Sequence, residues 1–171
     1  RRSEWVDVEH RALVVSLYQG VMLWQFDFRY KSDVAGRGKP KWQPDSNTAT
    51  FPVGYFLIPI DFLPAGTAPR IGIRDVGNNS MRRSLAPALL PPFPHSNKVP
   101  ILAPSHGSKL VFLACVGSFV MDMALRLKIS EATLNKFYLD ELPIPPSDSP
   151  WWTPALDRFI LGLCGTSPWF V

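Results

Sequence analysis

Arg70-Ile-Gly-Ile-Arg-Asp-Val-Gly-Asn-Asn-Ser-Met-Arg-Arg-Ser-Leu-Ala-Pro-Ala-Leu-Leu90 is the most informative stretch of the chain. Its first part, 70–76, alternates Arg, Ile, Ile and Asp around a glycine, which is typical of a strand with one face in water. Gly77-Asn-Asn-Ser80 is a turn signal, because glycine and asparagine tolerate positive φ. Residues 83–90 return as a second strand that Pro91-Pro92 ends. The sequence therefore predicts two strands joined across a tip rich in Asn and Arg.

Upstream of this stretch the sequence predicts another strand, an aromatic segment and a basic loop. Residues 11–18 are rich in β-branched and aliphatic residues and indicate a strand. The aromatic segment 20–30 has two interpretations, core packing or a surface for base stacking. Glycines and prolines in 31–45 are spaced too closely for regular structure. The apolar run 51–62 contains two prolines, so any strand in it is short or lies at an edge.

Downstream, the pattern becomes helical. Ser108 is expected to cap a helix, and residues 109–128 contain no proline and carry apolar residues at helical spacing. This pattern predicts one long, largely buried amphipathic helix, whose apolar residues include Val111, Phe112, Cys115, Phe119, Met123 and Leu127. Residues 130–138 are expected as a shorter helix or turn, 142–146 as an extended segment, and 154–165 as a final helix.

Together these elements predict an α+β domain, a twisted and mostly antiparallel sheet followed by a helical C-terminal portion. The sheet-and-loop part is expected over 1–107, and the helical supporting part of the same domain over 108–171. A chain of 171 residues with a hydrophobic fraction of 46% suits one globular domain with its own core.

The apolar runs and the start of the chain predict a cytoplasmic protein. No apolar run is long enough to span a bilayer, and the start lacks a signal-peptide pattern. Cys115 and Cys164 lie inside apolar runs, which favours buried free thiols over a disulfide or a metal pair. Buried free thiols are consistent with a reducing compartment.

Positive charge is concentrated in the middle of the chain. The formal net charge is +4, but residues 29–109 hold 11 Lys and Arg against four acids, and the remainder is net negative. A basic segment between acidic flanks favours a polyanionic partner, with chance clustering on a solvated surface as the alternative.

Catalytic and metal-binding patterns are not found. His10, His95 and His106 are far apart and have no Cys or acid at metal-ligand spacing. The chain contains no Gly-x-Ser-x-Gly elbow, no phosphate-binding glycine loop and no dinucleotide fingerprint. We therefore expect a chain without catalytic residues, metal or cofactor of its own.

Residue types that read nucleic acids cluster instead. Arginine and asparagine read guanine and adenine edges bidentately in the major groove, and such residues gather around the predicted turn. The expected base-edge and nearby backbone contacts are Arg74, Asn78, Asn79, Ser80, Arg82 and Arg83. The expected phosphate contacts are Arg29, Lys31, Lys39 and Lys41, helped by a flexible basic loop that includes Arg37. For 78–80, pure turn chemistry is the alternative.

Four blocks of the sequence, in order along almost the whole chain, share a pattern with one family. They are Ser16-Leu-Tyr-Gln-Gly-Val-Met22 with Gln25-Phe-Asp-Phe-Arg29; Arg74-Asp-Val-Gly-Asn-Asn-Ser-Met-Arg-Arg-Ser84 with Ala88-Leu-Leu-Pro-Pro92; Gly117-Ser-Phe-Val-Met-Asp122; and Leu134-Asn-Lys-Phe-Tyr-Leu-Asp-Glu-Leu-Pro-Ile-Pro-Pro146. This pattern resembles the C-terminal target-recognition domain of type IIG restriction–modification enzymes and related adenine-N6 DNA methyltransferases.

The chain departs from the family pattern at a few positions. Gln19, Val21 and Phe28 stand where the family has Glu, Lys and His, and Met81-Arg82 stands where it has Asn-Glu. The arginines and the asparagine of the pattern are kept, namely Arg29, Arg74, Asn78 and Arg83.

The resemblance implies a non-catalytic specificity domain for double-stranded DNA in a phage-defence system, with a fold like that of type I specificity subunits. It also implies a methyltransferase domain N-terminal to this region in the same polypeptide, with S-adenosylmethionine as its cofactor, and in some relatives a nuclease. Two other function classes stay open from the residues alone. One is a protein-interaction module whose aromatic segment and helices dock on a partner subunit, and the other is a binder of RNA or single strands.

Overall fold

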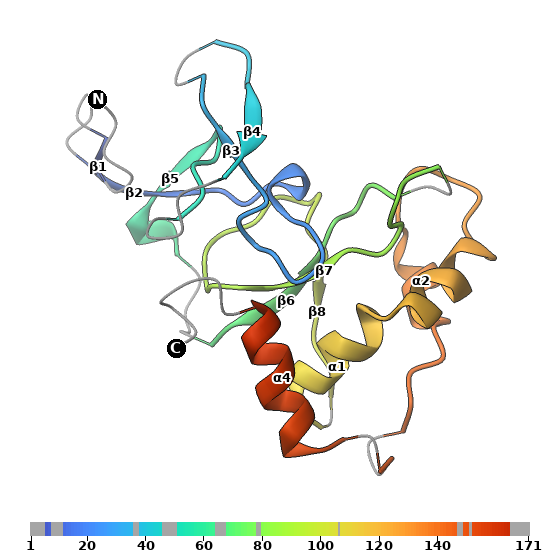
Figure 1. The fold of residues 1–171 in the computed structure, drawn as a ribbon. Helices are drawn as coiled ribbons and strands as arrows, with labels where there is room; N and C mark the ends of the chain where they lie inside the picture. Colours follow the sequence, from blue (N-terminus) through green and yellow to red (C-terminus); the bar gives the residue numbers. More distant parts are fainter. Residues whose placement is uncertain are drawn as a thin grey trace.

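The computed structural model describes residues 6–7, 12–35, 38–45, 51–63, 68–77, 80–105, 107–146, 149–150 and 152–164. These residues form an α+β fold with antiparallel sheets and four α-helices (Figure 1). As predicted, the described strands all precede the α-helices along the chain.

The described strands form three small antiparallel sheets in place of the one sheet that we expected. The first has the order β1-β2-β5, the second is the hairpin β3-β4, and the third has the order β7-β6-β8. Their bounds are β1 Val6–Asp7, β2 Ala12–Ser16, β3 Lys31–Asp33, β4 Trp42–Pro44, β5 Leu57–Pro59, β6 Arg70–Ile73, β7 Pro87–Leu90 and β8 Ile101–Leu102. The helices are α1 Lys109–Val116, α2 Phe119–Arg126, α3 Lys136–Asp140 and α4 Pro154–Cys164, with 3-10 turns η1 Gly20–Met22 and η2 Ile60–Phe62.

The antiparallel pair β6-β7 confirms the two strands predicted within 70–90, but the wet face expected for the first strand is covered. Ile71 and Leu89 pack in one cluster with residues of α1 and α4. Ala88 and Leu90 pack on the opposite side with residues of the segment 18–28. Gly72 makes the close packing possible, since a Cβ there would lie 2.4 Å from Cδ1 of Leu90. The β7-β6-β8 sheet is therefore the centre of the core.

The long helix predicted over 109–128 is in fact two helices. Gly117 ends α1, and the Ser118 side chain accepts a hydrogen bond from the Met121 amide, 3.1 Å away, so that a new helix starts. The break changes which side of the helix faces the core, because a serine cap restarts the helical phase. Phe119, Met123 and Leu127, expected on the buried side, are 80%, 55% and 77% exposed.

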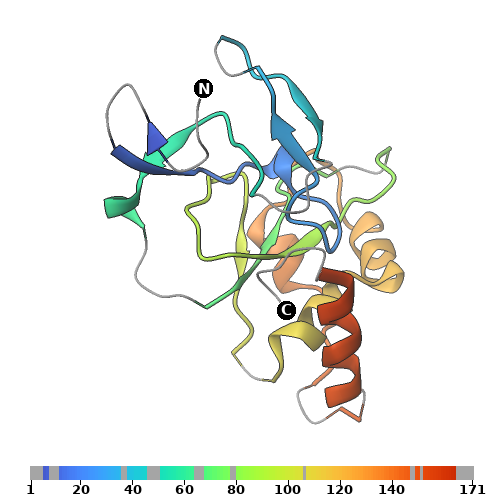
Figure 2. The ribbon, with the colours of Figure 1, turned by 60° about the vertical axis from the view of Figure 1, so that its left-hand side comes forward.

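Residues 31–45, expected to be irregular, contain the β3-β4 hairpin, in which Lys31 pairs with Pro44. Buried Asp33 explains this order, because its Oδ1 accepts hydrogen bonds from the amides of Ala35 and Lys41 at 3.0 and 2.8 Å. The carboxylate therefore closes the hairpin around the loop that bears the glycines. Figure 2 shows the hairpin standing away from the rest of the fold.

The short helix or turn expected over 130–138 is found further along, as α3, while several other predicted elements are confirmed. The strand β2, the short strand β5 and the helix α4 lie where the sequence placed them. Ser108 caps α1, its Oγ accepting from the Leu110 and Val111 amides. Cys115 and Cys164 are free thiols, the second fully buried and the first only partly. Among the described residues no helix combines the length and apolarity needed to cross a membrane.

Candidate nucleic-acid interface

Arg83, expected at the surface as a reader of base edges, is buried with 6% of its area exposed. Its Nε donates to Oε1 of Gln25 at 2.6 Å, and its NH2 donates to the carbonyl oxygen of Gly117 at 2.6 Å. Its NH1 lies 3.7 Å from Oδ2 of Asp122. Burial lowers the pKa of Arg83, and the Asp122 carboxylate opposes that shift. The prediction of a direct DNA contact by Arg83 is therefore wrong, because the guanidinium is buried and two of its nitrogens, Nε and NH2, are hydrogen-bonded inside the protein.

Asp122 fastens the segment after the turn to α2. Its Oδ1 accepts from the amides of Ser84 and Leu85 at 2.9 and 2.8 Å, and its Oδ2 accepts from Nε of Arg126 at 3.0 Å. Arg126 in turn donates to the carbonyl oxygen of Met81 at 2.6 Å. One buried carboxylate thus satisfies several donors at once, which fixes the course of residues 81–85.

The segment before the turn is also fixed to the rest of the fold, through Asp75. Asp75 is buried and binds Nζ of Lys98 at 2.8 Å, while its carbonyl oxygen accepts from the Leu134 amide at 2.7 Å. The segments before and after the turn touch at Gly77, because a Cβ there would lie 2.2 Å from the Ser84 carbonyl oxygen. The segments on both sides of the turn are therefore fixed to the rest of the fold. Loops held in this way by a rigid scaffold often carry binding residues.

Of the residues predicted at this turn, the structure exposes some and leaves others undescribed. Ser80 and Arg82 are exposed, and Arg74 is partly exposed. Asn78 and Asn79 lie outside the described residues.

Arg74 begins a row in which two stacked aromatic rings lie between two cations. Its Cζ lies 6.0 Å from the centre of the Trp24 ring, which stacks on Tyr30 with centroids 5.3 Å apart. Nζ of Lys31 lies 5.1 Å from the Tyr30 ring centre. The row connects the turn to the hairpin. Core packing was one interpretation of this aromatic segment, and it holds for Phe28, which is 1% exposed.

Of the phosphate contacts predicted from sequence, the structure exposes some and buries one. Lys39 and Lys41 are exposed at the hairpin, and Lys31 is partly exposed. Arg29, by contrast, is 6% exposed, and its guanidinium lies over the ring of Phe28 at 5.8 Å. The prediction that Arg29 holds a phosphate is contradicted by this burial. Arg37 lies outside the described residues.

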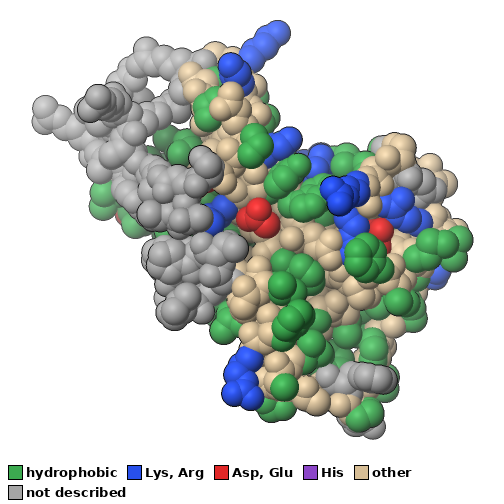
Figure 3. Space-filling model, viewed as in Figure 1, with side chains coloured by type: hydrophobic (Ala, Val, Ile, Leu, Met, Phe, Trp, Pro, Cys, Tyr) green, Lys and Arg blue, Asp and Glu red, His purple; other side chains and the backbone are tan. Residues whose placement is uncertain are grey.

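Figure 3 shows how the positive charge is distributed on one face of the molecule. Lys and Arg side chains gather in a band that runs from the β3-β4 hairpin, at the top of the view, across the middle to the α2 region on the right. Acidic side chains show at few places along this band. Basic groups from distant parts of the sequence are thus brought to a common face, although two of the expected members, Arg29 and Arg83, are internal.

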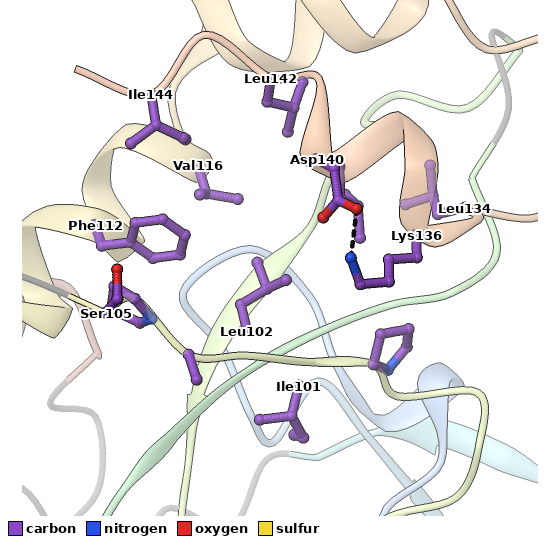
Figure 4. A pocket seen from close by; sticks show the side chains of 14 residues that line it. Ile101, Leu102, Ser105, Phe112, Val116, Leu134, Lys136, Asp140, Leu142 and Ile144 are labelled. Atoms are coloured by element: carbon purple, nitrogen blue, oxygen red, sulfur yellow. Dashed lines mark hydrogen bonds and ion pairs between the residues drawn. The ribbon is translucent and has the colours of Figure 1, made fainter. Parts of the chain in front are cut away.

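A cavity of about 370 Å³ opens beside Arg74, and much of its lining is apolar, from Leu17, Val21, Phe56 and Val76. Its lining includes the cations Arg74 and Lys98 and the side chains of Gln19, Ser96 and Asn97. Guanidinium, ammonium, amide and hydroxyl groups are those that bind phosphate oxygens and base edges. A larger cavity of about 660 Å³ lies between β8, α1 and α3, and its lining is mostly apolar, with the Lys136–Asp140 ion pair among its residues (Figure 4).

Sequence reasoning missed several residues that build this region. Asp122 and Gln25 were not singled out as partners of Arg83, because no local pattern links positions so far apart in the chain. Phe119 was assigned to the core by its helical spacing. The Gly117-Ser118 pair was the available signal, since a small residue followed by a serine can end one helix and cap the next.

Comparison of the chain with models of protein families, with curated proteins and with solved structures gave no significant match in any of the three.

Proposed function

We propose that this chain recognises double-stranded DNA in a sequence-dependent manner, as the specificity domain of a restriction–modification adenine-N6 methyltransferase. In this proposal a methyltransferase domain of the same polypeptide holds S-adenosylmethionine and methylates the adenine that this domain positions. The observation that carries the proposal is the band of Lys and Arg side chains on one face, next to a turn that is anchored on both sides.

The band supports a duplex as the partner, because phosphate neutralisation by Lys and Arg supplies most of the affinity of DNA-binding proteins. In the proposal Lys31, Lys39 and Lys41 contact phosphates. The anchored turn supports sequence reading, since base contacts need side chains held in a fixed register. Arg74 and Arg82 are assigned to base edges or nearby phosphates, and Ser80, Asn78 and Asn79 remain predictions at the same turn.

The blocks on which the family resemblance rests contact one another in the fold. Gln25 of the first block, Arg83 of the second and the Gly117–Asp122 stretch of the third are joined by hydrogen bonds. The fourth block contacts the second through the Leu134 amide and the Asp75 carbonyl oxygen. Residues of three of these blocks therefore build the network that anchors the turn. Arg83 then serves to hold the turn and not to read a base.

A selection experiment tests the proposal. The chain is mixed with a library of random-sequence duplexes, and the bound duplexes are recovered and sequenced. We expect enrichment of a common sequence, and we expect Arg74→Ala and Arg82→Ala to change the preferred base at one or two positions. Lys39→Ala should lower recovery of all sequences alike, since phosphate contacts carry no sequence information. Recovery of a pool with the composition of the input, by the unaltered chain, would contradict the proposal.

A further inference from the structure

Helix α2 begins with two large apolar side chains in solvent. Phe119 and Val120 are 80% and 76% exposed, whereas Met121 and Leu125 of the same helix are 4% and 0% exposed. Single exposed apolar residues are common on protein surfaces, but a phenylalanine next to a valine at such exposure forms a protruding pair. The pair stands where α2 starts, directly after the Gly117-Ser118 break.

The Phe119 ring is held by the same network that anchors the turn. Cζ of Arg83 lies 4.3 Å from the ring centre, a close cation–π contact. Arg83 itself is fixed by Gln25 and by the Gly117 carbonyl oxygen. The ring therefore has a cation on one face and solvent over most of its surface, and its position is set by buried partners.

The charge around the ring argues for the kind of partner. Arg82 is exposed next to Arg83 in the sequence, whereas Arg126 is bound to Asp122 and to the Met81 carbonyl oxygen. Figure 3 shows hydrophobic side chains standing among Lys and Arg side chains in the α2 region. A protein surface of apolar residues complements the ring but not the exposed guanidinium of Arg82. A nucleic acid complements both, because it offers anionic phosphates and flat base faces together.

We propose that Phe119, with Val120 beside it, is an apolar wedge that packs against a nucleobase at an unstacked step of bound duplex DNA. Phenylalanine and aliphatic side chains act in this way in proteins that kink DNA. This inference rests on the proposed function and adds to it a residue outside the anchored turn and the hairpin.

A duplex with a ready-made unstacked step provides the test. Two labelled duplexes of the same random sequence are compared, one fully paired and one with a single-nucleotide bulge, and binding is followed by anisotropy. We expect the unaltered chain to prefer the bulged duplex. Phe119→Ala should abolish that preference and weaken binding to the bulged duplex by roughly 10-fold, the scale of one base–aromatic stacking contact. Phe119→Trp should keep the preference, which shows that the ring and not the residue identity matters.

Two exposed apolar residues serve as matched controls. Leu127 is 77% exposed at the far end of α2, and Phe159 is 63% exposed on α4. Leu127→Ala and Phe159→Ala should leave the preference for the bulged duplex unchanged. Thermal unfolding of each variant verifies that the fold is kept, and a preference retained by Phe119→Trp but lost by Phe119→Ala identifies the effect as local.

The outcomes separate this inference from the proposed function. If the chain binds paired and bulged duplexes equally, or if Phe119→Ala keeps the preference, the wedge is wrong while duplex recognition stands. If Leu127→Ala loses as much as Phe119→Ala, the wedge is also wrong, because the preference then depends on the exposed side of α2 in general and not on the Phe119 ring. If the unaltered chain binds neither duplex at low salt, the proposed function fails and the wedge fails with it.

Discussion

The guanidinium of Arg83 and the carboxylate of Asp122 face each other inside the protein, with NH1 and Oδ2 3.7 Å apart and side chains only 6% and 8% exposed. The pair joins the segment after the turn to α2. A buried pair of this kind stabilises a fold only when hydrogen bonds satisfy the rest of both groups. Here the Ser84 and Leu85 amides complete the carboxylate, and Gln25 and Gly117 bind Nε and NH2 of Arg83. NH1 of Arg83 has no hydrogen-bond partner among the described residues, so the carboxylate is its main compensation.

Replacing Asp122 is expected to be strongly destabilising. Asp122→Ala removes the acceptor of two buried amides and leaves Arg83 without its counter-charge, so we expect a loss of about 3–5 kcal/mol in the free energy of unfolding. Asp140→Ala is the control, because its ion pair with Lys136 is exposed and is worth at most about 1 kcal/mol. Urea denaturation measures both. Similar losses for the two variants would show that the buried network does not stabilise the fold.

Tyr18 carries a hydroxyl group that is buried with no hydrogen-bond partner among the described residues. Burial raises the pKa of this phenol well above 10.0. Because an unpaired buried hydroxyl costs free energy, Tyr18→Phe should leave the protein as stable or increase the free energy of unfolding by about 1–2 kcal/mol. Chemical denaturation measures the change. A clear loss of stability would indicate that the hydroxyl has a partner.

Alkaline pH should destabilise the protein through Cys164. Burial raises the pKa of this thiol from 9.0 to about 11, with a hydrogen bond from the Leu89 backbone opposing part of the shift. As the pH rises above 9.0, the unfolded chain loses the proton and the folded chain keeps it, so the free energy of unfolding falls. One such group contributes at most about 1.4 kcal/mol per pH unit.

The Cys164→Ala variant isolates this contribution. Its unfolding free energy should fall less steeply with pH between the usual pKa values of cysteine and tyrosine, 9.0 and 10.0. Some dependence of the unfolding free energy on pH should remain in the variant, because burial also raises the pKa of Cys115. The slope is compared and not the absolute stability, because alanine also leaves a small void. Identical slopes in the two proteins would rule out the thiol as the source.

The lysines of the hairpin should act on DNA without regard to sequence. Lys39→Ala and Lys41→Ala should each reduce the dependence of log K on log salt by about 1, as expected for one phosphate contact. Lys136→Ala is the matched control, because that lysine is paired with Asp140 on α3 and should leave the slope unchanged. Titrations of one random-sequence duplex at several salt concentrations give the slopes. Equal slopes in all variants would remove the hairpin from the interface.

Local patterns in the sequence predicted the elements better than they predicted the site. The strand pair β6-β7, the Ser108 cap and helix α4 follow from periodicity and capping, which act over a few residues. The burial of Arg83 does not, because its partners come from positions 58 and 34 residues away. Periodicity also placed Phe119 in the core, since it cannot detect that Ser118 restarts the helix.

Competition between a random-sequence duplex and its separated single strands tests the central claim most directly. If the band of basic side chains is shaped for a duplex, the duplex should displace the strands, and its affinity should fall steadily as salt rises from about 50 to about 200 mM. Tighter binding of the single strands, or a duplex affinity that salt does not change, would contradict the account.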